Sequence, residues 1–135
     1  MITRKTAREQ TFILIFERSF NDLSVDEILE LATECKDFEI DDYIKSVFAG
    51  VFENIEEIDT AVSKNAVSWD ISRIGRVALS ILRLAIYEIK FREDIPINVS
   101  INEAVELAKK YATTEDASFI NGILGSVAKK QKTED

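Results

Sequence analysis

Hydrophobic positions recur every three to four residues along most of this chain. That spacing places apolar side chains on one face of an α-helix, whereas a half-buried strand would alternate them. One proline and four glycines are the only strong interruptions in the sequence. We therefore expect a compact all-α protein. The predicted helical segments are Thr3 to Phe20, Ser24 to Lys36, Ile40 to Val62, Ile71 to Arg92, Ile101 to Ala112 and Glu115 to Lys130.

The length and composition predict a single domain. The chain has 135 residues, of which 46% are hydrophobic, so it can enclose one apolar core but not two independent ones. The segment from Asn65 to Asp70, around Trp69, is the expected joint between an N-terminal helical half (about 1–64) and a C-terminal half (about 65–130). Residues 131–135 are expected to form a frayed polar tail.

Two helix starts carry the sequence pattern of a capping box, in which two side chains each accept a hydrogen bond from the other residue's backbone N–H. Ser24 with Glu27 forms the first. Ser100 with Glu103 forms the second, after Pro96 has ended the preceding helix. We expect both boxes to fix the first turn of a helix.

The segment from Ile71 to Arg92 is predicted to be the central helix, because it is apolar nearly all round and so must be enclosed by others. Glu88 lies among its apolar residues, where Arg92 is expected to pair with it. A polar stripe also runs along this helix, and its spacing leaves open whether it faces water or a protein partner. The stripe consists of Arg73, Arg76, Ser80, Arg83, Tyr87 and Lys90.

The charge is unevenly distributed along the chain. The net charge is −8, and residues 17–59 hold 14 acidic residues against three basic ones. Arg4, Lys5 and Arg8 nevertheless stand together at the start, and on a helix Arg4, Arg8, Thr11, Ile15 and Arg18 would form one line. Such a stripe suits phosphate groups, because arginine offers a bidentate fork. Spacing alone leaves both nucleic-acid contact and an ordinary solvated helix start open.

A second candidate surface lies at the start of the last predicted helix. Thr113 or Thr114 is expected to cap this helix, and Phe119 falls beside its inward-facing line. A half-exposed phenylalanine could stack on an unpaired RNA base, or it could simply complete the edge of the core. The sequence does not decide between these two interpretations.

The residue types argue against an enzyme. There is no histidine, Cys35 is the only cysteine, and no glycine-rich phosphate loop is present. Neighbouring carboxylates such as Asp41 and Asp42 would point apart on a helix rather than converge. We therefore expect no catalytic residue, no metal and no cofactor. No apolar run is long enough to cross a membrane, so a soluble cytoplasmic protein is expected.

Several stretches together resemble a known family. The run from Ile81 to Ala112, followed by Phe119 to Gly125, is similar to the signature of the NusB family of bacterial transcription antitermination factors. The opening stretch 3–10 resembles the arginine-rich start of that family, although Thr6 interrupts the cluster. Trp69 to Arg73 resembles the family's approach to the central helix.

The resemblance implies an all-helical protein of six to seven helices in two small packed bundles. It implies binding to the boxA element of nascent single-stranded RNA together with the small-subunit ribosomal protein NusE. The pair would help RNA polymerase in the elongation complex to pass terminators, especially in ribosomal RNA operons. The implied RNA contacts are Arg4, Lys5, Arg8, Asp116, Ser118 and Phe119. The implied contacts with the protein partner are Arg76, Ser80, Arg83 and Tyr87.

The alternative is a helical protein–protein interaction module, or a homodimer formed through the polar stripe, without an RNA role of its own. Such a module would bind its partner and leave RNA unshifted at any salt concentration.

Overall fold

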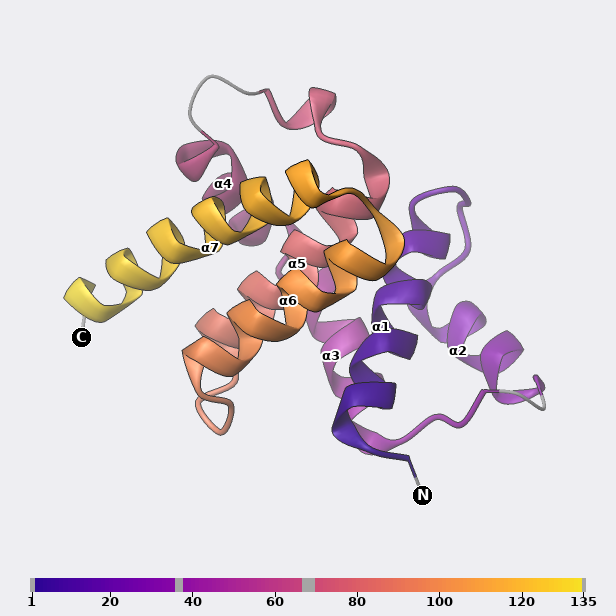
Figure 1. Ribbon diagram of the computed structural model, residues 1–135. Helices are drawn as coiled ribbons and strands as arrows, with labels where there is room; N and C mark the ends of the chain where they lie inside the picture. The colour runs from indigo at the N-terminus through magenta and orange to yellow at the C-terminus, as the bar shows by residue number, and fades with distance from the viewer. Residues whose placement is uncertain (1, 36–37, 67–69, 135) are drawn as a thin grey trace.

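The computed structural model describes residues 2–35, 38–66 and 70–134, so Trp69 and Lys36 lie outside the described residues. Within this part of the chain, all regular structure is helical, which confirms the all-α prediction (Figure 1). The elements are α1 (Arg4–Arg18), α2 (Val25–Thr33), α3 (Asp42–Glu53), α4 (Ile55–Asn65), the 3₁₀ turn η1 (Ile71–Arg73), α5 (Arg76–Phe91), α6 (Ile97–Tyr111) and α7 (Thr114–Glu134).

Helix α5 is the central element, as its apolar sequence predicted. It packs against α1 and α3 on one side and against α4, α6 and α7 on the other. Figure 1 shows α5 in the middle of the molecule, with α6 and α7 crossing in front of it. The helices thus form two small bundles that share α5. Its buried apolar residues are Ala78, Ile81, Leu82, Leu84, Ala85, Ile86 and Ile89.

Several predicted helix boundaries differ from the structure. The predicted segment from Ile40 to Val62 is two helices, which meet at Asn54. The Asn54 side-chain amide donates a hydrogen bond of 2.8 Å to the Gly50 carbonyl, and this local bond competes with continuation of the helix. Gly75 separates η1 from α5 within the predicted central segment. Helix α7 extends to Glu134, through residues where we expected a frayed tail.

One predicted capping box is confirmed and the other is wrong. Ser24 and Glu27 make both reciprocal hydrogen bonds at the start of α2. Helix α6 instead begins at Ile97, directly after Pro96, whose ring presets a φ angle suited to a helix start. Ser100 therefore lies inside the helix and is buried, so it cannot cap it.

The Ser100 hydroxyl serves a buried carboxylate instead. Glu88 of α5 has no exposed surface. Its Oε1 accepts a hydrogen bond of 2.7 Å from Ser100 Oγ, and its Oε2 accepts one of 2.8 Å from Arg8 Nε. The hydroxyl of Tyr43 also donates to Oε2. Side chains of α1, α3 and α6 thus meet on one carboxylate of α5.

The expected pairing of Glu88 with Arg92 is wrong, because Arg92 lies at the end of α5 and forms two hydrogen bonds of 2.9 Å with Asp94. Arg8 occupies the position at Glu88 instead. Burial disfavours a charged guanidinium, but the attraction of the Glu88 carboxylate outweighs this effect and raises the pKa of Arg8. The Arg8 guanidinium therefore keeps its positive charge within the core.

We predict that Glu88→Gln lowers the free energy of unfolding by about 3 to 5 kcal/mol, because it leaves the Arg8 guanidinium buried without its counter-charge. Urea denaturation followed by circular dichroism measures the loss. The matched control is the double variant Arg8→Met with Glu88→Gln, which removes both charges and should be more stable than Glu88→Gln alone. A loss below about 1 kcal/mol, or strict additivity of the two substitutions, would contradict the ion pair.

Candidate nucleic-acid interface

The start of α1 presents two exposed cations. Thr3 caps the helix, and its Oγ1 accepts a hydrogen bond of 3.1 Å from the Thr6 backbone N–H. Arg4 and Lys5 lie in the first turn and are exposed, and this turn holds no acidic residue. A helix N-terminus favours negative side chains, so these cations do not stabilise the helix through its dipole. The helix dipole therefore does not explain their position.

The ring of Tyr43 gathers guanidinium groups around it. The Arg4 guanidinium lies 4.5 Å from the ring centroid, that of Arg92 lies 5.5 Å away, and that of Arg8 lies 5.9 Å away. All three distances fall within the range of a cation–π interaction. Because the Tyr43 hydroxyl is held by Glu88, the buried cluster fixes the ring on which Arg4 rests.

The cations around this ring differ in what they can offer a ligand. Arg92 is paired with Asp94, and the hydrogen bonds from Arg92 lower the pKa of that carboxyl to about 2. Arg8 is 5% exposed and is committed to Glu88. Arg4 is exposed and stacks on Tyr43; its charge also helps to lower the pKa of Asp94, but none of the ion pairs found among the described residues involves it. Arg4 is therefore the guanidinium best placed to reach a phosphate.

The predicted line along α1 turns inward beyond its first turn. Arg8, Thr11 and Ile15 are all buried, so the line is not an exposed face. Thr11 donates a hydrogen bond of 2.8 Å to the Ala7 carbonyl. The Arg18 guanidinium lies 5.3 Å from the ring centroid of Phe52. The structure thus divides the predicted stripe, with Arg8 on the core side.

Lys5 lies beside a hollow of about 170 Å³ between α1 and α6. Its Nζ is 3.9 Å from a carboxylate oxygen of Glu103, and its side chain is 72% exposed. On the same pair of helices, Lys110 forms hydrogen bonds of 2.9 and 3.0 Å with Glu9. An exposed ion pair at the limit of contact contributes little, so Lys5 can leave Glu103 for a phosphate.

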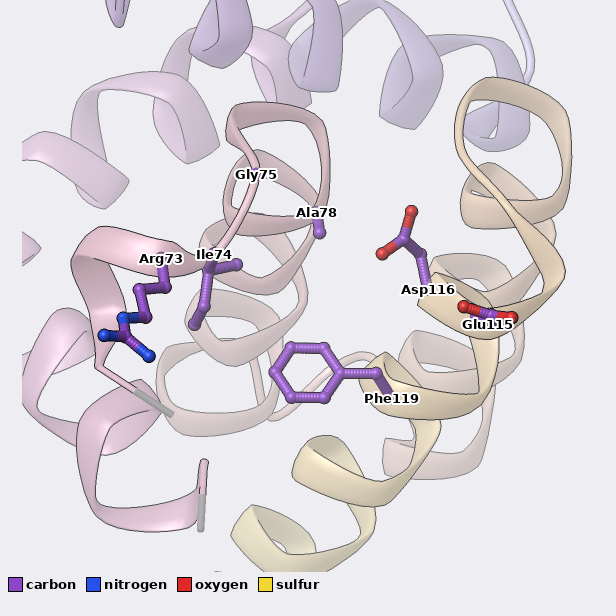
Figure 2. A pocket seen from close by; sticks show the side chains of 7 residues that line it. All are labelled: Arg73, Ile74, Gly75, Ala78, Glu115, Asp116 and Phe119. Atoms are coloured by element: carbon purple, nitrogen blue, oxygen red, sulfur yellow. The ribbon is translucent and has the colours of Figure 1, made fainter. Parts of the chain in front are cut away.

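The second predicted surface lies at a hollow of about 180 Å³ where α7 faces the start of α5 (Figure 2). The half-buried ring of Phe119 points into this hollow, toward Ile74. Arg73 of η1 lies on the far side of Ile74 from Phe119. The aromatic face of Phe119 can stack on an unpaired base, and Arg73 lines the same hollow across Ile74.

Asp116 has a local structural role beside Phe119. Thr113 Oγ1 accepts a hydrogen bond of 3.0 Å from the Asp116 backbone N–H, and Asp116 Oδ2 accepts one of 3.3 Å from the Thr113 N–H. Thr113, rather than Thr114, is therefore the residue that caps α7. Ser118 is exposed on the next turn. Asp116 shapes this edge of the hollow, while Phe119 provides its aromatic surface.

The polar stripe of α5 is mostly occupied by contacts within the protein. Ser80 is buried and donates a hydrogen bond of 2.7 Å to the Arg76 carbonyl. Arg83 forms two hydrogen bonds, of 2.9 and 3.0 Å, with Asp59. Tyr87 lies so close to Gly50 that a Cβ at that position would overlap its ring. These three residues support the helix packing from within.

The Arg76 end of the stripe is open to solvent. The Arg76 guanidinium lies 4.2 Å from the ring centroid of Phe20, which is 58% exposed. Phe20 is exposed because α1 ends at Arg18, before the predicted end at Phe20. Helical spacing could not predict this pair, since its two residues are far apart along the chain.

The chemistry of Tyr43 predicts a pH effect. Burial and the neighbouring Glu88 carboxylate raise the pKa of Tyr43. Tyr43 therefore stays protonated in the folded protein while the unfolded chain ionises near pH 10, so its stabilising contribution falls as the pH rises above about 10. We predict that Tyr43→Phe costs about 1 to 3 kcal/mol of unfolding free energy at pH 7. The difference from wild type should shrink above pH 10 in urea titrations, and a difference that grows there would contradict this assignment.

Comparison with known proteins agrees with this architecture. The NusB family profile matches residues 5–129. The transcription antitermination protein NusB of Clostridium botulinum (strain Kyoto / Type A2) is 44% identical, over 93% of this chain and 99% of its own. The NusB protein of Natranaerobius thermophilus is 47% identical, over 94% of this chain and 95% of its own.

Solved structures show the same fold. NusB of T. maritima superimposes with a TM-score of 0.84 at 35% identity and covers 99% of both chains. The NusB chain of a complex of the antitermination factors NusB and NusE with double-stranded RNA superimposes with a TM-score of 0.84 at 28% identity. It covers 94% of this chain and 96% of its own. Because the family profile spans nearly the whole chain and full-length relatives share over 40% of their residues with it, this chain belongs to the NusB family.

Proposed function

We propose that this protein is an RNA-binding transcription antitermination factor. It binds a boxA element in nascent RNA together with the ribosomal protein NusE, and the complex helps RNA polymerase to read through terminators in ribosomal RNA operons. Family membership and the similarity to a NusB chain solved with NusE and RNA support this proposal. The protein acts by binding rather than catalysis, in the cytoplasm where transcription takes place.

The observation that carries the RNA site is the exposed pair Arg4 and Lys5 at a helix start that would favour acidic residues. Arg4 is held on the Tyr43 ring, so part of its side-chain freedom is already lost before RNA arrives. Arg8 has an indirect role in this proposal. It is buried against Glu88 and Tyr43, where it supports the ring under Arg4, and it does not contact the RNA itself. The two exposed cations neutralise phosphates, which gives affinity without base specificity.

Phe119 forms the second part of the RNA site. Its ring points into the hollow beside Arg73, where an unpaired base can stack on it. Asp116 lines this hollow on α7, and Ser118 is exposed between Asp116 and Phe119. The acidic block of residues 17–59 repels RNA from the α2 side and thereby directs it toward these basic and aromatic positions.

The ribosomal protein binds at the Arg76 end of α5 in this proposal. Arg76 and Phe20 form an exposed cation–π pair there, and both residue types are enriched in protein interfaces. Ser80, Arg83 and Tyr87 hold α5 in place below the surface. Fixed packing of these three residues keeps the exposed pair in one position.

We predict that Arg4→Ala with Lys5→Ala weakens binding to a boxA single strand at least tenfold at moderate salt, with helicity unchanged. The slope of log affinity against log salt should become shallower by about 1.4, because two phosphates on a single strand lose their partners. An RNA mobility-shift titration measures both quantities.

The matched control is Lys64→Ala with Lys109→Ala, which removes the same charge from exposed positions on α4 and α6. The control should bind RNA like wild type. Equal losses in both variants would mean a general charge effect and would refute the assigned site. Binding to NusE with no RNA shift in wild type, at any salt, would establish the interaction module in place of the RNA-binding factor.

A further inference from the structure

A largely apolar hollow of about 220 Å³ lies between α1 and α2, away from the proposed RNA contacts. It also reaches the segments on either side of α2. Its lining residues are Leu14, Glu17, Asn21, Leu23, Ile28, Leu31, Ala32, Cys35 and Phe38. We call this hollow the α2 groove.

Helix α2 leaves much of its apolar side uncovered. Its main packing partners are α1 and α3, and Figure 1 shows it at the edge of the molecule. Ile28 is its only buried residue among those described. Leu31 lies one turn further along the same side and is 57% exposed. An exposed leucine that lines a hollow is a usual anchor point for a partner side chain.

One carboxylate, that of Glu17, lines the α2 groove, and α2 and its flanking segments carry further exposed carboxylates. Along residues 17–35 the only cation is Arg18, and its guanidinium is turned over Phe52. No ion pair within the described residues involves any of the carboxylates on this stretch. These exposed carboxylates belong to Glu17, Asp22, Asp26, Glu27, Glu30 and Glu34.

The spacing of the acidic and apolar residues on α2 is one that a helix of a partner protein can complement. Ile28 and Leu31 lie three residues apart on one side of α2, and Cys35, just beyond the C-cap Glu34, lines the same hollow. Glu27 precedes Leu31 by one turn and Glu34 follows it by one turn. Leu31 thus lies between the carboxylates of Glu27 and Glu34 along α2. This arrangement complements a partner helix that carries an apolar stripe bordered by basic residues.

We propose that the α2 groove binds a basic amphipathic helix of a protein partner. An aliphatic or aromatic side chain of that helix enters the hollow beside Leu31, and its lysines and arginines meet the surrounding carboxylates. Apolar anchors at helical spacing supply the affinity, and the opposite charges supply orientation and a fast association rate. RNA and anionic lipid surfaces are repelled by the same carboxylates. This site is separate from the RNA surface and does not depend on it.

The test uses a synthetic 14-residue peptide of leucine and lysine at helical spacing, titrated into the full chain by calorimetry. The wild-type protein should bind the peptide. The single variant Leu31→Asn should bind it at least tenfold more weakly, and so should the double variant Glu27→Gln with Glu30→Gln. Cys35 is the only cysteine and lines the groove, so bound peptide should slow its alkylation by iodoacetamide. The matched control is Glu56→Gln with Glu57→Gln on α4, which should bind like wild type.

An equal loss of peptide affinity in the control and in the groove variants would mean that general charge attraction causes the binding. That result would overturn the proposal. Unchanged alkylation of Cys35 at saturating peptide, or no binding by wild type, would overturn it as well. Self-association of the wild-type protein in sedimentation, abolished by Leu31→Asn, would assign the groove to a second copy instead. Circular dichroism confirms that each variant is folded, and the RNA shift should be the same for all of them.

Discussion

The hydrogen bonds to the buried carboxylate of Glu88 determine how the helices of this protein are arranged. This carboxylate has no exposed surface and accepts hydrogen bonds from Arg8, Tyr43 and Ser100, which lie on α1, α3 and α6. A buried charge is tolerated only when its partners are in place, so these helices must dock on α5 in one arrangement. The apolar core supplies most of the stability, while this cluster fixes where α1 lies on the bundle.

That constraint also determines the candidate RNA surface. Because Arg8 is used by Glu88, the basic opening of the chain divides into an inner cation and the outer pair Arg4 and Lys5. Tyr43 connects the two parts, since its hydroxyl reaches Glu88 and its ring carries the Arg4 guanidinium. The fold thereby converts a flexible basic terminus into cations at a defined position, in a protein that is otherwise acidic.

The sequence predicted the helices well because their periodicity and caps are local properties, as at Ser24. It missed the break at Asn54, where one side-chain hydrogen bond interrupts a pattern that remains apolar on both sides. It also assigned Ser100 to a cap and Arg8 to the surface. Ser100 and Arg8 both form hydrogen bonds with Glu88, which is 12 residues away from Ser100 and 80 residues away from Arg8 in the sequence. Helical spacing cannot predict pairs at such separations. The family resemblance implied an RNA-binding segment at the start of the chain but not which of its cations face outward.

The most direct test compares the salt dependence of RNA affinity for Arg4→Gln and Arg8→Gln, each measured under conditions where the variant is folded. The account predicts that Arg4→Gln makes the log–log slope shallower by about 0.7, the loss of one phosphate contact on a single strand. Arg8→Gln should lower the free energy of unfolding and leave the slope unchanged. A shallower slope for Arg8→Gln, with no change for Arg4→Gln, would contradict the division between an inner and an outer cation.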